Sequence, residues 1–318
     1  MTDDASEIDA QASVLMKSGI RLLNEGSREG AAEALGYFDR ALSLRRRLPI
    51  DMVPVFRYGL AACLLNRADA FVRLGGDGNL EAALGAYDEA TSLLRTLPLG
   101  DDPRFARRLA MAHQNRGIAL QLRDATDLGA VAAFNEALNV LAAPEAASIT
   151  DREYLRAAAL VNLANAWAAM KAEGAAAFAR QAALDAMTLV AESEATDTAA
   201  AEVGLKARHI LCRAVAQNLS TASSGAHVPD GVHEATDAVD DGLRLVRLWE
   251  QNGIARFRPV AADLLVFGVF VYGTFQPHFV DEFVRENLDP ASAPSEFLES
   301  VEIRGAIARI SGLFGRSG

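Results

Sequence analysis

The strongest constraint on the fold of this chain is a distance between small residues that recurs along most of its 318 residues. Five short, similar strings recur along the chain, for example Tyr-Phe-Asp-Arg-Ala-Leu and Ala-Tyr-Asp-Glu-Ala-Thr. Each string contains a small residue near its end. A second small residue, called the mark below, precedes each string. The string residues are Ala41, Ala90, Ala137, Ala186 and Gly242, and the preceding marks are Gly19, Ala68, Gly117, Ala164 and Ala214. From each string residue to the next mark the interval is 27, 27, 27 and 28 residues. The length alone would allow two globular domains, so this interval favours one array of internal repeats.

Each repeat has the pattern of two helices joined by a turn. Apolar residues share one helical face in the first half of a repeat, as Leu60 and Leu64 do, and again in the second half. The interval within a repeat varies from 20 to 28 residues, and this variation falls between the halves, where the Gly-Gly-Asp-Gly string at 75–78 predicts an exposed turn. No strand-like alternation stands out. The sequence therefore predicts an all-α solenoid of about five helix pairs.

The repeat residues resemble the tetratricopeptide repeat family. That family places a small residue and then an aromatic residue on the first helix, and a small-x3-aromatic-x2-Ala pattern on the second. The matching residues of the second repeat are Ala68, Phe71, Gly75, Ala83, Tyr87 and Ala90. The resemblance covers about residues 10–250, although the period exceeds the family's usual length of about 34 residues. It implies a TPR-like α-α superhelix with a concave groove.

One recurring asparagine is similar to a feature of the kinesin light chain type of repeat, which also has a longer period. It stands two residues before the mark in three repeats, as Asn66, Asn115 and Asn162. In that subgroup the equivalent asparagine faces the groove and holds the backbone of a bound peptide. The resemblance therefore implies a peptide partner in the concave groove.

Other polar residues around the marks complete a predicted groove. The full set is Asn66, Asp69, Arg73, Gln114, Asn115, Gln121, Asn162 and Asn165. Side-chain amides donate and accept hydrogen bonds at once, which suits an extended peptide backbone. The alternative is an ordinary solvated helix face. An arginine stands directly before the mark in three repeats, as Arg67, Arg116 and Arg213. We expect these arginines either to pair with acidic groups on adjacent helices or to form a cationic strip.

The composition divides the chain into three segments. Residues 1–9 are rich in acidic side chains and are expected to be flexible, and residues 10–255 carry the repeats. Residues 256–318 contain eight of the fourteen phenylalanines, and helices are expected near 258–274, 277–287 and 295–314. A sixth mark at Gly268 has no matching second-helix pattern. This last segment is interpreted as a helical cap on the solenoid, or alternatively as a docking surface anchored by Phe297 and Phe314.

The charge and the missing motifs argue against several classes of function. A net charge of −11 disfavours sequence-independent nucleic-acid binding. No phosphate loop, zinc-finger spacing or nucleophile elbow is present, so no cofactor is expected and an enzyme is disfavoured. His227, Asp230 and His233 lie close in sequence, but such a polar loop is more often solvated than metal-bound, and no metal is expected. Cys63 and Cys212 are too few for a disulfide framework.

The location and partners follow from the same features. The apolar stretch at 260–275 is shorter than the roughly 20 residues of a membrane span and contains Asp263, so no membrane insertion is expected. No export signal opens the sequence, and a cytoplasmic location is expected. We expect a non-catalytic adaptor or chaperone-like module that binds a protein or peptide. The alternative is a regulatory subunit that docks on an enzyme through its C-terminal aromatic helices, and a homo-oligomer remains open.

Overall fold

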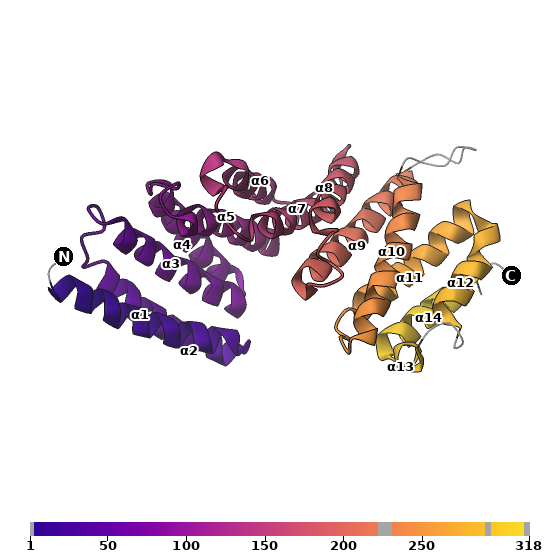
Figure 1. Ribbon diagram of the computed structural model, residues 1–318, viewed down its shortest axis with the longest axis horizontal. Helices are drawn as coiled ribbons and strands as arrows, with labels where there is room; N and C mark the ends of the chain where they lie inside the picture. The colour runs from indigo at the N-terminus through magenta and orange to yellow at the C-terminus, as the bar shows by residue number, and fades with distance from the viewer. Residues whose placement is uncertain (1–2, 222–230, 290–293, 315–318) are drawn as a thin grey trace. The chain divides into compact units, whose positions relative to one another are not determined.

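A computed structural model describes residues 3–221, 231–289 and 294–314, and these residues form helices and connecting turns without a strand. The chain divides into two compact units, Met1–Ala166 (unit 1) and Trp167–Gly318 (unit 2). Figure 1 labels their helices in chain order. The prediction of an all-α protein is confirmed for the described residues.

Unit 1 is built from helices that pack in the order of the sequence. Its helices are α1 (Asp3–Asn24), α2 (Arg28–Arg45), α3 (Pro54–Leu74), α4 (Asp77–Arg95), α5 (Pro103–Arg123), α6 (Leu128–Ala142), the 3-10 turn η1 (Pro144–Ala146) and α7 (Arg152–Ala169), which continues into unit 2. The closest pairs are α1 with α2, α3 with α4, and α5 with α6, and each pair packs on the next. The first helices of the pairs, called A helices below, also contact one another, α1 with α3 and α3 with α5.

The small marks are points where the two helices of a pair approach closely. A Cβ atom added at Gly19 or at Gly117 would lie 2.5 Å from a ring carbon of Phe38 or Phe134 respectively, and both rings are fully buried. A side chain at either glycine would therefore push the two helices apart or displace the ring. The recurring interval in the sequence thus reflects a recurring contact between helices.

Local sequence signals position the helix ends. The side chains of Ser27, Asp102 and Asp127 accept hydrogen bonds from backbone N–H groups in the first turns of α2, α5 and α6. The helix α3 ends at Leu74 with Gly75 as its C-cap, and α4 begins after Gly76. Both glycines have a positive φ, which glycine adopts at little cost. The turn predicted at 75–78 is therefore confirmed at its first two residues, while the last two already belong to α4.

The prediction that residues 1–9 are flexible is wrong from Asp3 onward. The helix α1 begins there, and Ala5 and Ile8 are buried against Leu48 and Phe56. Asp9 forms an ion pair of 3.3 Å with Arg45, whose side chain is buried. The acidic residues therefore occupy the outer face of a helix whose inner face belongs to the core of unit 1.

Unit 2 continues the pairing of helices. It contains the end of α7 and the helices α8 (Ala175–Val190), α9 (Thr198–Thr221), α10 (Val232–Gln251), α11 (Arg258–Phe275), the 3-10 turn η2 (Pro277–Phe279), α12 (Val280–Leu288), α13 (Ser295–Leu298) and α14 (Val301–Phe314). The helix expected near 258–274 is confirmed, and those near 277–287 and 295–314 are each divided in two. A Cβ at Gly268 would collide with the ring of Phe283 on α12. Although no second-helix pattern follows Gly268 in the sequence, α11 and α12 form a sixth pair with the same kind of contact.

The C-terminal aromatic anchor predicted at Phe297 is not on the surface. Phe297 is 3% exposed and lies in the core of unit 2 with Ile303, Ala306 and Ile310 of α14. The helix α14 packs against α11, so it covers the sixth pair. This arrangement agrees with a cap and removes Phe297 as a docking residue, while the side chain of Phe314 lies outside the described residues.

Among the described helices, only α11 is long and apolar enough to cross a membrane by length and composition. It contacts α9, α10, α12 and α14, and Leu264 and Leu265 on its inner face are fully buried. Asp263 on the same helix accepts a hydrogen bond of 3.2 Å from Arg309. The apolar side chains of α11 therefore pack in the core of unit 2.

Candidate functional site

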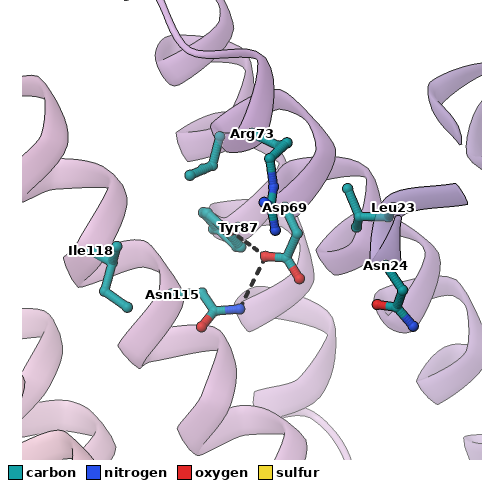
Figure 2. Close-up of a pocket in the computed structure, with 8 residues that line it drawn as sticks. Leu23, Asn24, Asp69, Arg73, Tyr87, Asn115 and Ile118 are labelled. Carbon is teal, nitrogen blue, oxygen red and sulfur yellow. Dashed lines mark hydrogen bonds between the residues drawn. The ribbon is translucent and has the colours of Figure 1, made fainter. Parts of the chain in front are cut away.

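A pocket of about 550 Å³ opens between the A helices of unit 1. Its walls come from α1, α3, α4 and α5, so three successive helix pairs contribute to it (Figure 2). The lining residues are Leu23, Asn24, Asp69, Val72, Arg73, Tyr87, Asn115 and Ile118. The lining combines apolar side chains with a few polar groups, as is usual for binding sites.

Asp69 is the centre of a hydrogen-bond network in this pocket. The Tyr87 hydroxyl donates to Asp69 Oδ1 at 2.5 Å, and Asn115 Nδ2 donates to the same oxygen at 3.0 Å (Figure 2). Burial raises the pKa of Asp69 above its ordinary value, while the bonds from Tyr87 and Asn115 and the charge of Arg108 oppose that rise. Burial and the neighbouring carboxylate raise the pKa of Tyr87, so this phenol stays protonated as a donor.

The two arginines near Asp69 are bonded to other groups. Arg73, one helical turn after Asp69, donates from Nη1 to the carbonyl oxygen of Gly26 at 3.4 Å. Arg108 donates from Nη2 to the hydroxyl of Tyr58 at 3.2 Å. The pocket therefore presents a carboxylate and an exposed guanidinium from the same helix, one turn apart (Figure 2).

Three of the predicted groove residues line this pocket together: Asp69, Arg73 and Asn115. Gln121, Asn162 and Asn165 are half-buried on α5 and α7 and do not line it. The prediction of a single continuous set of groove residues is thus reduced to a smaller group centred on α3.

Two of the predicted groove residues use their amides within the fold. Asn66 donates to the carbonyl oxygen of Ala62 on its own helix at 2.8 Å. Gln114 is buried and donates to the carbonyl oxygen of Leu155 at 2.9 Å, which ties α5 to α7. The prediction that Gln114 faces a partner is wrong, because its amide is needed to satisfy a backbone group between two helices.

Five lining residues were missed from the sequence: Leu23, Asn24, Val72, Tyr87 and Ile118. A signal for two of them was present in the repeat. Asn24 stands five residues after its mark, as Arg73 does, and Ile118 stands one residue after its mark, as Asp69 does. Comparing equivalent positions between repeats would therefore have found these two residues, whereas a search for polar residues did not.

Two arginines that stand directly after the recurring asparagine form ion pairs with acidic residues of the preceding helix pair. Arg67 donates to Asp39 at 2.6 Å and Arg116 donates to Asp88 at 2.6 Å. In both pairs the partners are 28 residues apart. Of the two expectations for these residues, pairing with adjacent helices is confirmed for Arg67 and Arg116.

A second pocket, of about 360 Å³, lies in unit 2 between α9, α11 and α14. His209, Cys212 and Asp263 line it, which is a combination found in nucleophilic catalysis. The thiol of Cys212 is 1% exposed, its Sγ lies 3.9 Å from the carbonyl oxygen of Ala235, and burial raises its pKa. A thiol in this state is a weak nucleophile, so the pocket of unit 1 is the stronger candidate.

The sequence places His227, Asp230 and His233 close together, and no metal is expected there. The first two residues lie outside the described part of the chain, and within that part no three His, Cys, Asp or Glu side chains gather as metal ligands.

No protein-family model matches this chain, and no curated protein matches it in sequence.

Proposed function

We propose that this protein is a TPR-like, non-catalytic interaction module that binds an extended peptide segment of a partner along the A helices of unit 1. The observation that carries the proposal is the pocket around Asp69, to which three successive helix pairs contribute. A site assembled across repeats is typical of solenoid proteins, whose binding surfaces extend over neighbouring units.

The repeat architecture supports the family assignment in this proposal. Successive pairs pack in sequence order, and the A helices α1, α3 and α5 lie in contact as a row. The small marks face aromatic rings of the second helices, as at Gly19 with Phe38 and Gly117 with Phe134. These are the contacts for which the tetratricopeptide pattern reserves small and aromatic residues.

The chemistry of the pocket supports binding of a peptide. Amide, carboxylate and guanidinium groups from Asn24, Asn115, Asp69 and Arg73 supply both donors and acceptors. The lining holds no Ser, Thr, Cys, Lys or His side chain, and its carboxylate, Asp69, accepts hydrogen bonds from Tyr87 and Asn115. A volume of about 550 Å³ accommodates one or two side chains of a peptide whose backbone continues along the helices.

The test is binding to an array of immobilised random nonapeptides. The variant Ile118→Trp places a large ring in the pocket, and Ser92→Trp adds the same ring at an exposed position of α4 outside the pocket. We expect wild type and Ser92→Trp to bind the same subset of peptides, and Ile118→Trp to lose them. Equal binding by Ile118→Trp, with helical content unchanged by circular dichroism, would exclude the pocket as the binding site.

A further inference from the structure

The two oxygens of the Asp69 carboxylate have different surroundings. Oδ1 accepts from both Tyr87 and Asn115. Figure 2 shows the other oxygen pointing away from both donors. Resting on the proposed function, we infer that this pocket receives a basic side chain, lysine or arginine, of the bound peptide, with the outer oxygen of Asp69 as its acceptor.

The walls of the pocket suit the stem of such a side chain. Leu23, Val72 and Ile118 supply apolar surface from three different A helices. Lysine and arginine bury their methylene groups along apolar surface and keep the charged head with a polar partner. A pocket with apolar walls and a carboxylate therefore matches both parts of a basic side chain.

Two side-chain amides also line the pocket. Asn115 donates through Nδ2 to Asp69, which leaves its side-chain oxygen as an acceptor, and Figure 2 shows that oxygen directed away from Asp69. Asn24 lines the opposite wall. An ammonium has three N–H donors and a guanidinium has five, so both head groups profit from acceptors beyond one carboxylate.

In the described structure, no arginine is bonded to the outer oxygen of Asp69. Arg73 and Arg108 are engaged with Gly26 and Tyr58 instead. Burial raises the pKa of this carboxyl, because its charged form loses hydration that the bonds from Tyr87 and Asn115 only partly replace. A bound cation replaces that hydration, whereas an acidic side chain would bring a second negative charge beside the first. Arg73 at the rim is then a donor for a backbone carbonyl of the peptide.

The experiment uses an array of nonapeptides with randomised flanks and a fixed central residue. The central residue is lysine, arginine, uncharged norleucine or glutamate. Asp69→Asn keeps an oxygen for Tyr87 and Asn115 and removes the charge. Asp88→Asn is the matched control, because it removes one negative charge from an exposed side chain outside the pocket, where Asp88 pairs with Arg116.

We expect peptides centred on lysine or arginine to bind wild type and Asp88→Asn alike. We expect Asp69→Asn to bind them at least about tenfold more weakly, as the loss of one charge-assisted hydrogen bond requires. Peptides centred on norleucine should bind Asp69→Asn and wild type equally.

Three results would overturn the inference: a preference for glutamate, no preference for a basic residue, or equal losses in both variants. If peptides still bind and are lost in Ile118→Trp, these results leave the proposed function standing and remove only the basic subsite. If no peptide binds wild type, the proposed function fails and the basic subsite fails with it.

Discussion

One buried imidazole makes the stability of unit 1 depend on pH. His113 on α5 is 4% exposed, and its Nε2 has no hydrogen-bond partner within the described structure. Burial lowers the pKa of His113 from 6.5 to about 4, and the nearby charge of Arg95 acts in the same direction. The unfolded chain therefore binds a proton below pH 6.5 that the folded protein takes up only near pH 4. The contribution of neutral His113 to stability is complete above pH 6.5 and is lost as the pH falls through that window.

We predict that His113→Leu weakens this pH dependence. Between pH 7 and pH 5 the free energy of unfolding of wild type should fall by about 2 kcal/mol more than that of the variant, since one pH unit corresponds to about 1.4 kcal/mol. Urea unfolding followed by circular dichroism measures both. His278→Leu, at an exposed position of unit 2, controls for the loss of an imidazole. Equal drops in wild type and His113→Leu would show that His113 is not the titrating group.

At the scale of helices, the contact between a small mark and an aromatic ring determines how closely a pair packs. Gly117 on α5 faces Phe134 on α6 with no room for a Cβ atom, whereas Gly85 on α4 has open space around it. The two glycines carry the same intrinsic cost in a helix, about 1 kcal/mol relative to alanine. They therefore separate helix propensity from packing.

We predict opposite effects of alanine at these two positions. Gly85→Ala should raise the free energy of unfolding by about 0.5–1 kcal/mol. Gly117→Ala should lower it by about 1–3 kcal/mol, the usual cost of overpacking, and replacing Phe134 with leucine in the same chain should recover part of the loss. Urea unfolding of wild type, Gly117→Ala, Phe134→Leu and the double variant gives the coupling between the two positions. A stabilised Gly117→Ala variant would show that the two helices separate without cost.

The helix pattern explains which parts of the fold and the site the sequence could predict. Periodicity predicted the paired helices because it records which face is buried. The sixth pair was missed because Phe283 follows Gly268 by 15 residues, whereas Phe134 follows Gly117 by 17 and Phe38 follows Gly19 by 19. Residues 3–9 were misjudged because their charges hide the apolar spacing of Ala5 and Ile8.

The site was predicted in part for a related reason. Position in the repeat gave the face on which Asp69, Arg73 and Asn115 lie. It did not give the bonding partner of each amide, which depends on the neighbouring helix. Asn66 and Asn115 occupy equivalent positions, yet one bonds to its own helix and the other to Asp69. The recurrence of asparagine therefore does not by itself indicate a shared function.

At the scale of the whole molecule, each unit contains its own buried core. In unit 2, Arg208 is 6% exposed and forms two hydrogen bonds of 2.7 Å with Glu194. Trp249 donates from its indole nitrogen to the backbone carbonyl of Glu194 at 3.1 Å. Both tryptophans of the chain, Trp167 and Trp249, belong to unit 2, so tryptophan fluorescence reports on that unit.

We predict that Arg208→Met destabilises unit 2 selectively. It leaves the largely buried carboxylate of Glu194, whose side chain is 13% exposed, without its partner, which costs about 3 kcal/mol. The fluorescence transition in urea should move to lower concentration, while the part of the circular dichroism transition that belongs to unit 1 stays in place. Lys206→Met, which breaks the exposed pair with Glu202, should cost less than about 1 kcal/mol. A shift of the entire circular dichroism transition in Arg208→Met would show that the two units unfold together.

The arginine–aspartate bonds between neighbouring pairs give the α3–α4 hairpin two complementary ends. Arg67 on α3 reaches back to Asp39 of the preceding pair, and Asp88 on α4 receives Arg116 of the following pair. A gene duplication that copied this hairpin and its linker, one 49-residue period, would give the new copy an arginine for the old Asp88 and an aspartate for Arg116. The same joint would form on both sides of the insert without any further substitution. The array could thus gain length, in evolution or in the laboratory, by copying a segment that already carries both halves of its connector.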